Sequence, residues 1–61
     1  MATATDQILE MMVELEAIKV DAGKFENGNN SAGTRVRLGM QRIKEKAQLV
    51  RTTVSAKKAA A

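Results

Sequence analysis

The chain has 61 residues, too few for more than one domain, and a core of this size seldom contributes more than about 3–5 kcal/mol to stability. It contains no Cys, His, Tyr or Trp, so it lacks disulfides, the usual zinc ligands and the side chains that most often act as bases and nucleophiles near neutral pH. We therefore expect no enzymatic activity, no metal, no cofactor and no small-molecule substrate. Self-association is the remaining way to stabilise so thin a core.

Charge is distributed unevenly along the chain. Residues 1–28 carry six acids and two Lys, a net charge of −4, whereas residues 29–61 carry eight Lys or Arg and one Glu, a net charge of +7. No apolar run approaches the roughly 20 residues that span a bilayer, and the first seven residues lack the basic start and apolar run of a signal peptide. These features predict a cytoplasmic protein that makes no contact with a membrane.

The first predicted element is a helix over about residues 5–27. Its apolar residues alternate at intervals of three and four, which aligns them along one face. This heptad seam consists of Ile8, Met11, Leu15, Ile18, Ala22 and Phe25. Thr5 is the expected N-terminal cap, with Asp6 in the first turn, because a hydroxyl accepts a bond from an orphan N–H and an acid suits the helix dipole.

A turn at residues 28–30 should separate this helix from a second one. The run from Asn27 to Ser31 contains residues that tolerate left-handed conformations and side chains that bond to nearby backbone. Asn30 or Ser31 is the expected cap of the second helix.

The second helix is predicted over about residues 31–57, followed by a flexible basic C-terminus at residues 58–61. Its seam, extended backwards by Gly33, consists of Val36, Met40, Ile43, Ala47, Val50 and Val54. The β-branched residues within 50–54 favour a strand locally, but we expect the seam to prevail. Two long helices joined by a short turn predict an all-α fold, an antiparallel two-helix hairpin that resembles a coiled coil.

Further apolar residues lie off the first seam. Five of them follow one flank of the first helix and predict burial against another chain, most simply in a homodimer with four helices. They are Leu9, Met12, Val13, Ala17 and Val20. The residues expected to form the core of the hairpin and of the dimer are Leu9, Met12, Val13, Leu15, Ile18, Val20, Phe25, Val36, Met40, Ile43 and Val50.

Four basic residues of the second helix are spaced seven apart and share one edge, namely Arg37, Lys44, Arg51 and Lys58. Such an edge is either a solvated surface that pairs with the acidic first helix or a site for a polyanion. A rough antiparallel register places Glu14 opposite Lys46 and Glu26 opposite Arg37. It leaves at least half of the edge without an acidic neighbour, and Arg35 and Arg42 likewise, which favours polyanion binding.

Two other features have structural and functional interpretations. Gly33 and Gly39 each cost roughly 1 kcal/mol relative to Ala inside a helix, which indicates close backbone approach. For Gly33 we prefer convergence of the helices near the turn over a phosphate site in the first helical turn. The acids Asp6, Glu10 and Glu14 recur every four residues, and we expect a solvated face there rather than a cation site.

The segment from Glu26 to Arg37 resembles the bacterial linker-histone-like proteins of the chlamydial type. Those proteins typically read Glu, any residue, Gly, Asn, Lys, small, Ala, small, any residue, Arg, any residue, Arg across the turn between their helices. Residues 43–51 are similar to the next stretch of the family, although Asn30 stands where Lys is common and Val50 where an aromatic residue often occurs. The chlamydial members continue into a long tail rich in Lys, Ala and Pro, so the sequence is expected to be a short form without that tail.

The resemblance implies a small DNA-binding, nucleoid-associated protein. We expect it to be non-enzymatic, to bind double-stranded DNA largely independently of sequence, and to compact or bridge it. Arg35 and Arg37 are the basic residues that match the family motif. The residues expected to contact DNA are Arg35, Arg37, Arg42, Lys44, Lys46, Arg51, Lys57 and Lys58. RNA is not excluded, but the lack of Tyr and Trp leaves no stacking platform for single strands and favours a duplex. The alternative is a helical protein-interaction module that uses Leu9, Val13 and Val20 and has no nucleic-acid role.

Overall fold

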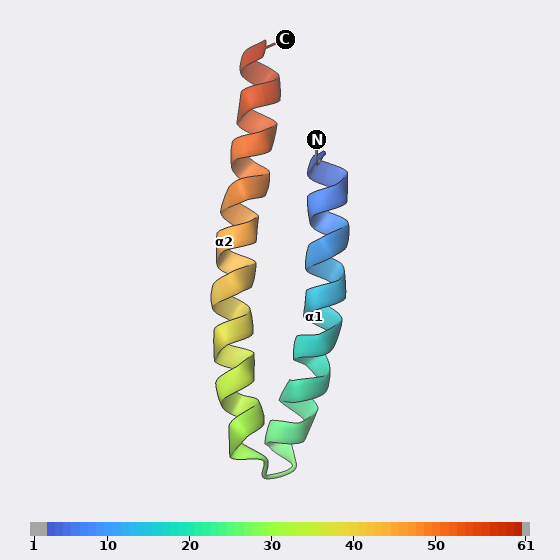
Figure 1. Ribbon diagram of the computed structural model, residues 1–61, viewed down its shortest axis with the longest axis vertical. Coiled ribbons are helices and arrows are strands. Elements are labelled where there is room, and N and C mark those ends of the chain that lie inside the picture. Colours follow the sequence, from blue (N-terminus) through green and yellow to red (C-terminus); the bar gives the residue numbers. More distant parts are fainter. Residues whose placement is uncertain (1–2, 61) are drawn as a thin grey trace.

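The computed structural model describes residues 3–60 as two long helices joined by a tight turn. Helix α1 spans Ala4–Glu26, and helix α2 spans Asn30–Ala60. The helices lie side by side and run in opposite directions (Figure 1), so the predicted all-α, antiparallel two-helix hairpin is confirmed. Because α1 has 23 residues and α2 has 31, α2 extends beyond the start of α1 by roughly 12 Å at 1.5 Å per residue.

A capping box on Thr3 and Asp6 fixes the start of α1. The Asp6 N–H donates to the Thr3 hydroxyl (3.1 Å), and the Thr3 N–H donates to the Asp6 carboxylate (3.3 Å). The predicted cap at Thr5 is wrong by two residues. The acid three positions after Thr3 distinguishes the two threonines, because the position three after Thr5 is occupied by Ile8, which cannot return the bond.

The turn occupies residues 27–29 and ends α1 in a Schellman motif. Gly28 adopts a φ of +100°, a left-handed conformation that a side chain disfavours. Its N–H donates to the Phe25 carbonyl (2.9 Å), and the Asn29 N–H donates to the Lys24 carbonyl (3.0 Å). Two carbonyls that α1 leaves unpaired at its end are thereby satisfied.

Asn29 also starts α2. Its Oδ1 accepts a hydrogen bond from the Ala32 N–H (3.1 Å), which is the bond that an N-terminal cap makes. The predicted cap at Asn30 or Ser31 is therefore wrong, because the turn is one residue earlier than the sequence pattern indicates. Both residues belong to the first turn of α2.

The β-branched stretch within residues 50–54 remains helical, as predicted. The hydroxyls of Thr52 and Thr53 donate to the backbone carbonyls four residues earlier, each at 3.0 Å, so they add to the helical bonds rather than compete with them. The predicted end at residue 57 is three residues too early. Residues 58–60 are helical rather than flexible, and residue 61 of the predicted flexible segment lies outside the described residues.

The two helices meet along a heptad seam in which alternate positions are displaced by one residue from the predicted seam. Seven of the twelve apolar residues of the predicted seam are half-buried, namely Met11, Ile18, Ala22, Val36, Ile43, Ala47 and Val50, and the other five are exposed. Other contact positions hold polar or small residues, which are Gln7, Glu14, Asp21, Gly39, Lys46, Thr53 and Ala32, the last of them fully buried. The prediction had placed in the seam the residues one position further along, which are Ile8, Leu15, Ala22, Met40, Ala47 and Val54.

Two glycines of α2 explain how closely the helices approach. A Cβ atom at Gly39 would lie 2.6 Å from Ile18 Cγ1, and a Cβ atom at Gly33 would lie 2.6 Å from Cδ1 of Phe25. Both separations are shorter than two carbon atoms tolerate, so a side chain at Gly39 would have to displace Ile18, and one at Gly33 would have to displace the ring of Phe25. The predicted role of Gly33 in helix convergence is confirmed. Gly39 likewise leaves room for Ile18 of α1 to pack closely against α2.

The hairpin leaves most of its large apolar side chains exposed. Of the residues predicted to form the core or the dimer, four are half-buried (Ile18, Val36, Ile43 and Val50), and the others are exposed by between 42% (Leu15, Met40) and 73% (Val13). The accessible surface is 4958 Å², whereas a folded monomer of 6.6 kDa is expected to expose about 3,900 Å². The expected thin core is confirmed, and the isolated hairpin exposes about 1,000 Å² more than a compact protein of its mass.

Candidate nucleic-acid interface

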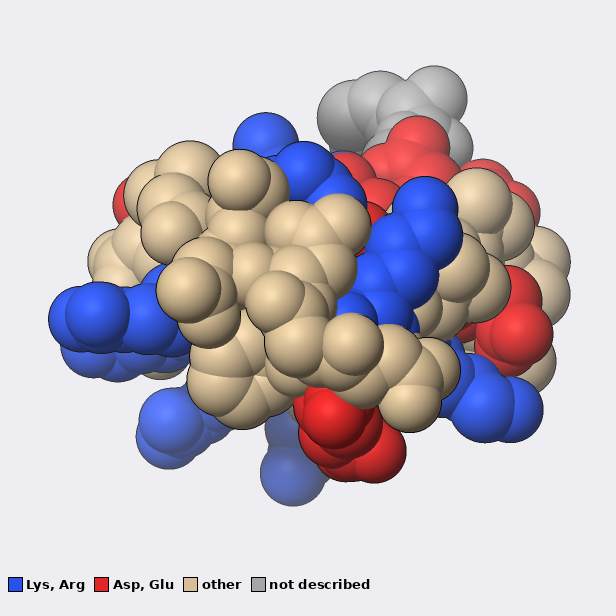
Figure 2. Space-filling model, turned by 90° about the horizontal axis from the view of Figure 1, so that it is seen from below, with Lys and Arg blue, Asp and Glu red and all other residues tan. Residues whose placement is uncertain are grey.

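All eight residues predicted to contact nucleic acid belong to α2, whose one acid is Glu45. They are Arg35, Arg37, Arg42, Lys44, Lys46, Arg51, Lys57 and Lys58. Figure 2 views the molecule from the turn and shows Lys and Arg projecting from its left, α2 side and most of the visible acids toward its right, where other Lys and Arg also lie. The uneven charge of the sequence is therefore also an uneven charge of the surface.

Two of the eight cations are neutralised by α1. Arg35 Nε donates to Asp21 Oδ1 at 3.0 Å, and Lys46 Nζ donates to Glu14 Oε1 at 2.8 Å and lies 4.0 Å from Glu10 Oε2. The predicted pairing of Glu14 with Lys46 is confirmed. The prediction that Arg35 has no acidic neighbour is wrong. We call this side of the hairpin the charged flank, made of Glu10, Glu14, Asp21, Arg35, Arg42 and Lys46.

Two carboxylates of α1 hold the ammonium group of Lys46 against that helix. Its pKa is raised above the ordinary value because its ammonium group donates a hydrogen bond to Glu14 and is attracted by the carboxylates of Glu14 and Glu10. Partial burial and the positive charge of Arg42 oppose this shift. Lys46 is therefore a cation at neutral pH, but a polyanion would have to displace two carboxylates to reach it.

Four other cations form a row along the opposite flank of α2. This basic row consists of Arg37, Lys44, Arg51 and Lys58, all of them exposed. Successive members lie about 10.5 Å apart along the axis and drift around the helix by about 20° per step. No carboxylate among residues 3–60 lies within 4.0 Å of any of them.

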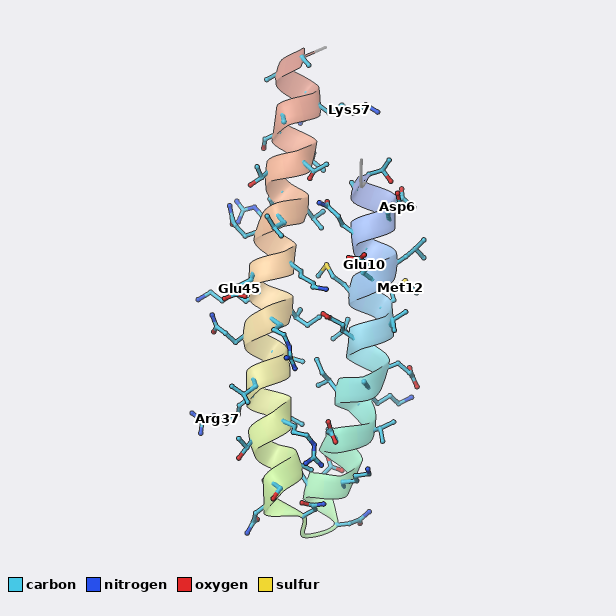
Figure 3. The ribbon with its side chains drawn as sticks, in the orientation of Figure 1. Asp6, Glu10, Met12, Arg37, Glu45 and Lys57 are labelled. Carbon is cyan, nitrogen blue, oxygen red and sulfur yellow. The ribbon has the colours of Figure 1, made fainter. Side chains whose placement is uncertain are left out.

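The predicted pairing of Glu26 with Arg37 does not occur among the described side chains. Arg37 projects from α2 away from α1 (Figure 3). The basic row is thus more completely unpaired than the sequence register indicated.

The last turn of α2 adds Lys57 and Lys58. Lys57 projects over the end of the hairpin, beside the start of α1 (Figure 3), and both lysines line a groove there with Thr5 and Val54. Cations in the last turn also interact favourably with the helix dipole, so these two lysines stabilise the end of α2 whether or not they meet a ligand.

The basic row borders an apolar surface. We call this surface the open face, made of six residues of the predicted seam: Ile8, Leu15, Met40 and Val54, which are exposed, and Ala22 and Ala47, which are half-buried. A groove beside the turn is lined by Ala22, Phe25, Val36 and Arg37, which places the start of the basic row next to this face. A groove on the charged flank is lined instead by Glu14, Ala17, Gly39 and Arg42.

Sequence reasoning missed Asp21 as a partner of the basic residues. Asp21 follows Glu14 by seven residues and Gln7 by fourteen, so the three polar residues form one row along α1. A heptad that begins at Ala4 and includes this row describes the contact between the helices better than the purely apolar seam. The seven-residue spacing of this polar row was visible in the sequence, but the prediction followed the most apolar stripe instead.

Other kinds of site find no support in residues 3–60. The acids Asp6, Glu10 and Glu14 do not come together with other groups in a cluster that could hold a metal ion, as far as the described side chains go. Within the same residues, neither helix is long and apolar enough to cross a membrane.

Comparison with known proteins adds one finding. A family model described as histone H1-like protein Hc1 matches residues 5–60, which include the basic row, the turn and nearly all of α1. No curated protein and no solved structure matches the chain.

Proposed function

Because the chain belongs to the family of histone H1-like proteins Hc1, we propose that it is a non-enzymatic, nucleoid-associated protein that binds double-stranded DNA through phosphate contacts and acts as a homodimer. Phosphate contacts are largely independent of base sequence and release counterions from the duplex. The protein would then coat, compact or bridge DNA rather than recognise a particular site.

The basic row is the observation that carries this proposal. Its four cations are exposed, evenly spaced and free of carboxylate partners within residues 3–60. Reading bases in the major groove requires side chains that match a local pattern of donors and acceptors. An evenly spaced row of Lys and Arg along some 30 Å of helix instead follows the charge of an extended polyanion.

The ion pairs of the charged flank divide the predicted contact residues into two groups. Arg35 and Lys46 hold α1 against α2, so we assign them to the hairpin and give them a secondary place in DNA binding. Arg42 and Lys57 are exposed and have no carboxylate within 4.0 Å in the described part of the chain. We propose that they supplement the basic row.

A duplex is a better partner than a single strand. Proteins that bind single strands stack successive bases on aromatic side chains, and Phe25 is the only aromatic residue of the sequence. Its ring lies against the backbone of Gly33, where a Cβ atom would come within 2.6 Å. Double-stranded RNA offers the same phosphate charge as DNA, so the experiment below includes both.

The alternative function is a protein-interaction module. It is favoured by the exposure of Leu9, Val13 and Val20, between 53% and 73%, on the side of α1 that faces away from α2. In that case the basic row would serve solubility or electrostatic steering.

A pair of double variants with the same net charge tests the proposal. Lys44→Gln with Arg51→Gln removes two members of the basic row, and Lys19→Gln with Lys24→Gln removes two exposed cations of α1. Fluorescence anisotropy with a labelled DNA duplex, and with an RNA duplex of the same length, measures affinity across a range of salt concentrations. Circular dichroism confirms that helicity is retained.

We expect the basic-row variant to bind more weakly and to flatten the slope of log affinity against log salt by about 1.8, at 0.9 per phosphate contact. The α1 variant should change both quantities much less. Equal losses in the two variants would mean that net charge rather than the basic row governs binding. No binding by the parent would favour the protein-interaction module.

A further inference from the structure

We propose that the open face of one chain packs against the open face of a second copy, with the two turns at the same end of the resulting four-helix bundle. This inference specifies the geometry of the homodimer and rests on that part of the proposed function. It does not depend on DNA, so it is tested with the protein alone.

The exposed area is large enough for a substantial interface with a partner. The hairpin exposes 4958 Å², about 1,000 Å² more than a compact chain of the same mass. A stable protein–protein interface buries about 800 Å² on each partner. A second copy of the hairpin, packed along its length, supplies an interface of that size.

The open face is the part of the surface best suited to that contact. It draws apolar residues from both helices, and it adjoins the half-buried seam residues Ile18 and Ile43, so a second copy would close one continuous core. The sequence also favours this contact. Its most apolar heptad stripe is centred between the seam and the open face, so the apolar surface of each helix is wide enough to serve both. In a four-helix bundle each helix must contact two neighbours, which requires such a wide stripe.

The outer side of α1 is a weaker candidate. Leu9, Val13 and Val20 come from one helix only. Glu16 lies in the same stripe, because a helix turns by about 100° per residue and Glu16 falls between Leu9 and Met12 around the axis. Pairing this stripe with its own copy would bring two copies of Glu16 toward the contact, where burial of an unpaired carboxylate is costly.

Charge decides the orientation of the two copies. Three members of the basic row, Lys44, Arg51 and Lys58, each follow an open-face residue of α2 by four positions, so the row lies along the boundary with the second copy. The equivalent positions of α1 are Thr5, Met12, Lys19 and Glu26, whose charges sum to zero. Two-fold symmetry allows two face-to-face arrangements: α2 over the partner's α2, with the turns at opposite ends, or α2 over the partner's α1, with the turns at the same end.

The first arrangement places four cations against four cations, which opposes association. The second places each basic row against a neutral edge, where the long side chains can keep their charged ends in water while their stems cover apolar surface. The second arrangement is therefore favoured, and each basic row remains available at the rim of the bundle.

Spin-label distances distinguish the two arrangements. The chain has no Cys, so Asn27→Cys at the turn and Ser55→Cys near the far end of α2 each give a single label per chain. With the turns at the same end, both labels should lie within about 25 Å of their copies, since neighbouring helix axes are 8–10 Å apart. With the turns at opposite ends, each label should lie about 35–40 Å from its copy, at 1.5 Å per residue from the middle of the hairpin.

Sedimentation equilibrium of two matched variants identifies the face. Leu15→Gln with Met40→Gln alters the open face, and Val13→Gln with Val20→Gln alters the outer side of α1. We expect the open-face variant to be monomeric and the outer variant to remain dimeric. Short label distances together with this pattern support the proposal. Long distances, absence of coupling between labels, or loss of the dimer in the outer variant alone would overturn it.

Discussion

Replacing Gly39 by Ala tests how closely the two helices pack. The new Cβ atom would lie 2.6 Å from Ile18 Cγ1 and 2.7 Å from Ile18 Cδ1. Ile18 cannot easily turn away, because a β-branched side chain in a helix is confined to essentially one rotamer. Overpacking of this kind costs typically 1–3 kcal/mol, against a gain of about 1 kcal/mol from the better helix propensity of Ala. Gly39→Ala should therefore destabilise the protein by about 0–2 kcal/mol.

Two other glycines provide matched controls. A Cβ atom at Gly23 would meet nothing within 4 Å, so Gly23→Ala should stabilise the protein by about 0.5–1 kcal/mol. A Cβ atom at Gly33 would meet the ring of Phe25, which is half exposed and can swing toward solvent. Gly33→Ala should therefore fall between the other two variants.

Urea unfolding followed by circular dichroism at one protein concentration measures all three variants. A single concentration is needed because association contributes to apparent stability. The expected order of stability is Gly23→Ala, then Gly33→Ala, then Gly39→Ala, with about 1–3 kcal/mol between the first and the last. If Gly39→Ala stabilises the protein as much as Gly23→Ala does, the close approach of Ile18 to α2 is wrong.

Three further predictions concern the ends of the helices and the ion pairs. Thr3→Ala removes the acceptor of the Asp6 N–H and should lower the free energy of unfolding by about 1 kcal/mol, whereas Thr5→Ala should change it little; equal losses would contradict the capping box. Gly28→Ala forces a side chain into a left-handed conformation and should cost about 1–2 kcal/mol in the same urea assay, and a neutral result would contradict the turn geometry. The raised pKa of Lys46 means that its ion pair stabilises the fold fully below the unfolded pKa and that this contribution is lost as pH rises through the folded pKa, above about 10.5. The parent should therefore lose more stability in alkaline solution than Lys46→Met, and parallel pH profiles would count against the pair.

The two helices were predictable because long heptad patterns determine helices well and a run of Asn and Gly determines a turn. The ends were less predictable. Thr3 and Thr5 have the same hydroxyl, and only the acid three residues after Thr3 selects between them. The N-terminal cap at Asn29 rather than Asn30 depends on how the turn closes, which neighbouring Asn residues of equal propensity do not reveal.

A stripe of apolar residues predicts which side of a helix is buried better than it predicts which residues contact the other helix. The most apolar heptad includes Leu15 and Met40, yet the hairpin places Glu14 and Gly39 at the contact. Gly39 permits the closest approach of α2 to Ile18, and Glu14 can pair there with Lys46. Those gains depend on both helices at once, so a pattern read along one helix does not contain them.

The seven-residue spacing correctly predicted that the four residues of the basic row share one exposed edge of α2, because spacing alone determines which residues share an edge of a helix. Which cations α1 neutralises was not accessible in the same way. Arg35 is paired with Asp21, fourteen residues away, and a rough register with an error of a few residues misses such a contact. The structure therefore changes which of the predicted basic residues are free to meet a ligand, and it adds no residue to the predicted set.

The salt dependence of DNA affinity tests the central claim most directly. Affinity would be measured for several unrelated duplexes from low to physiological salt. If each of the four residues of the basic row meets one phosphate, the slope of log affinity against log salt should be about −3.6 per hairpin and nearly the same for every duplex. A flat salt response, or a hundred-fold preference for one duplex, would contradict phosphate contact through the basic row.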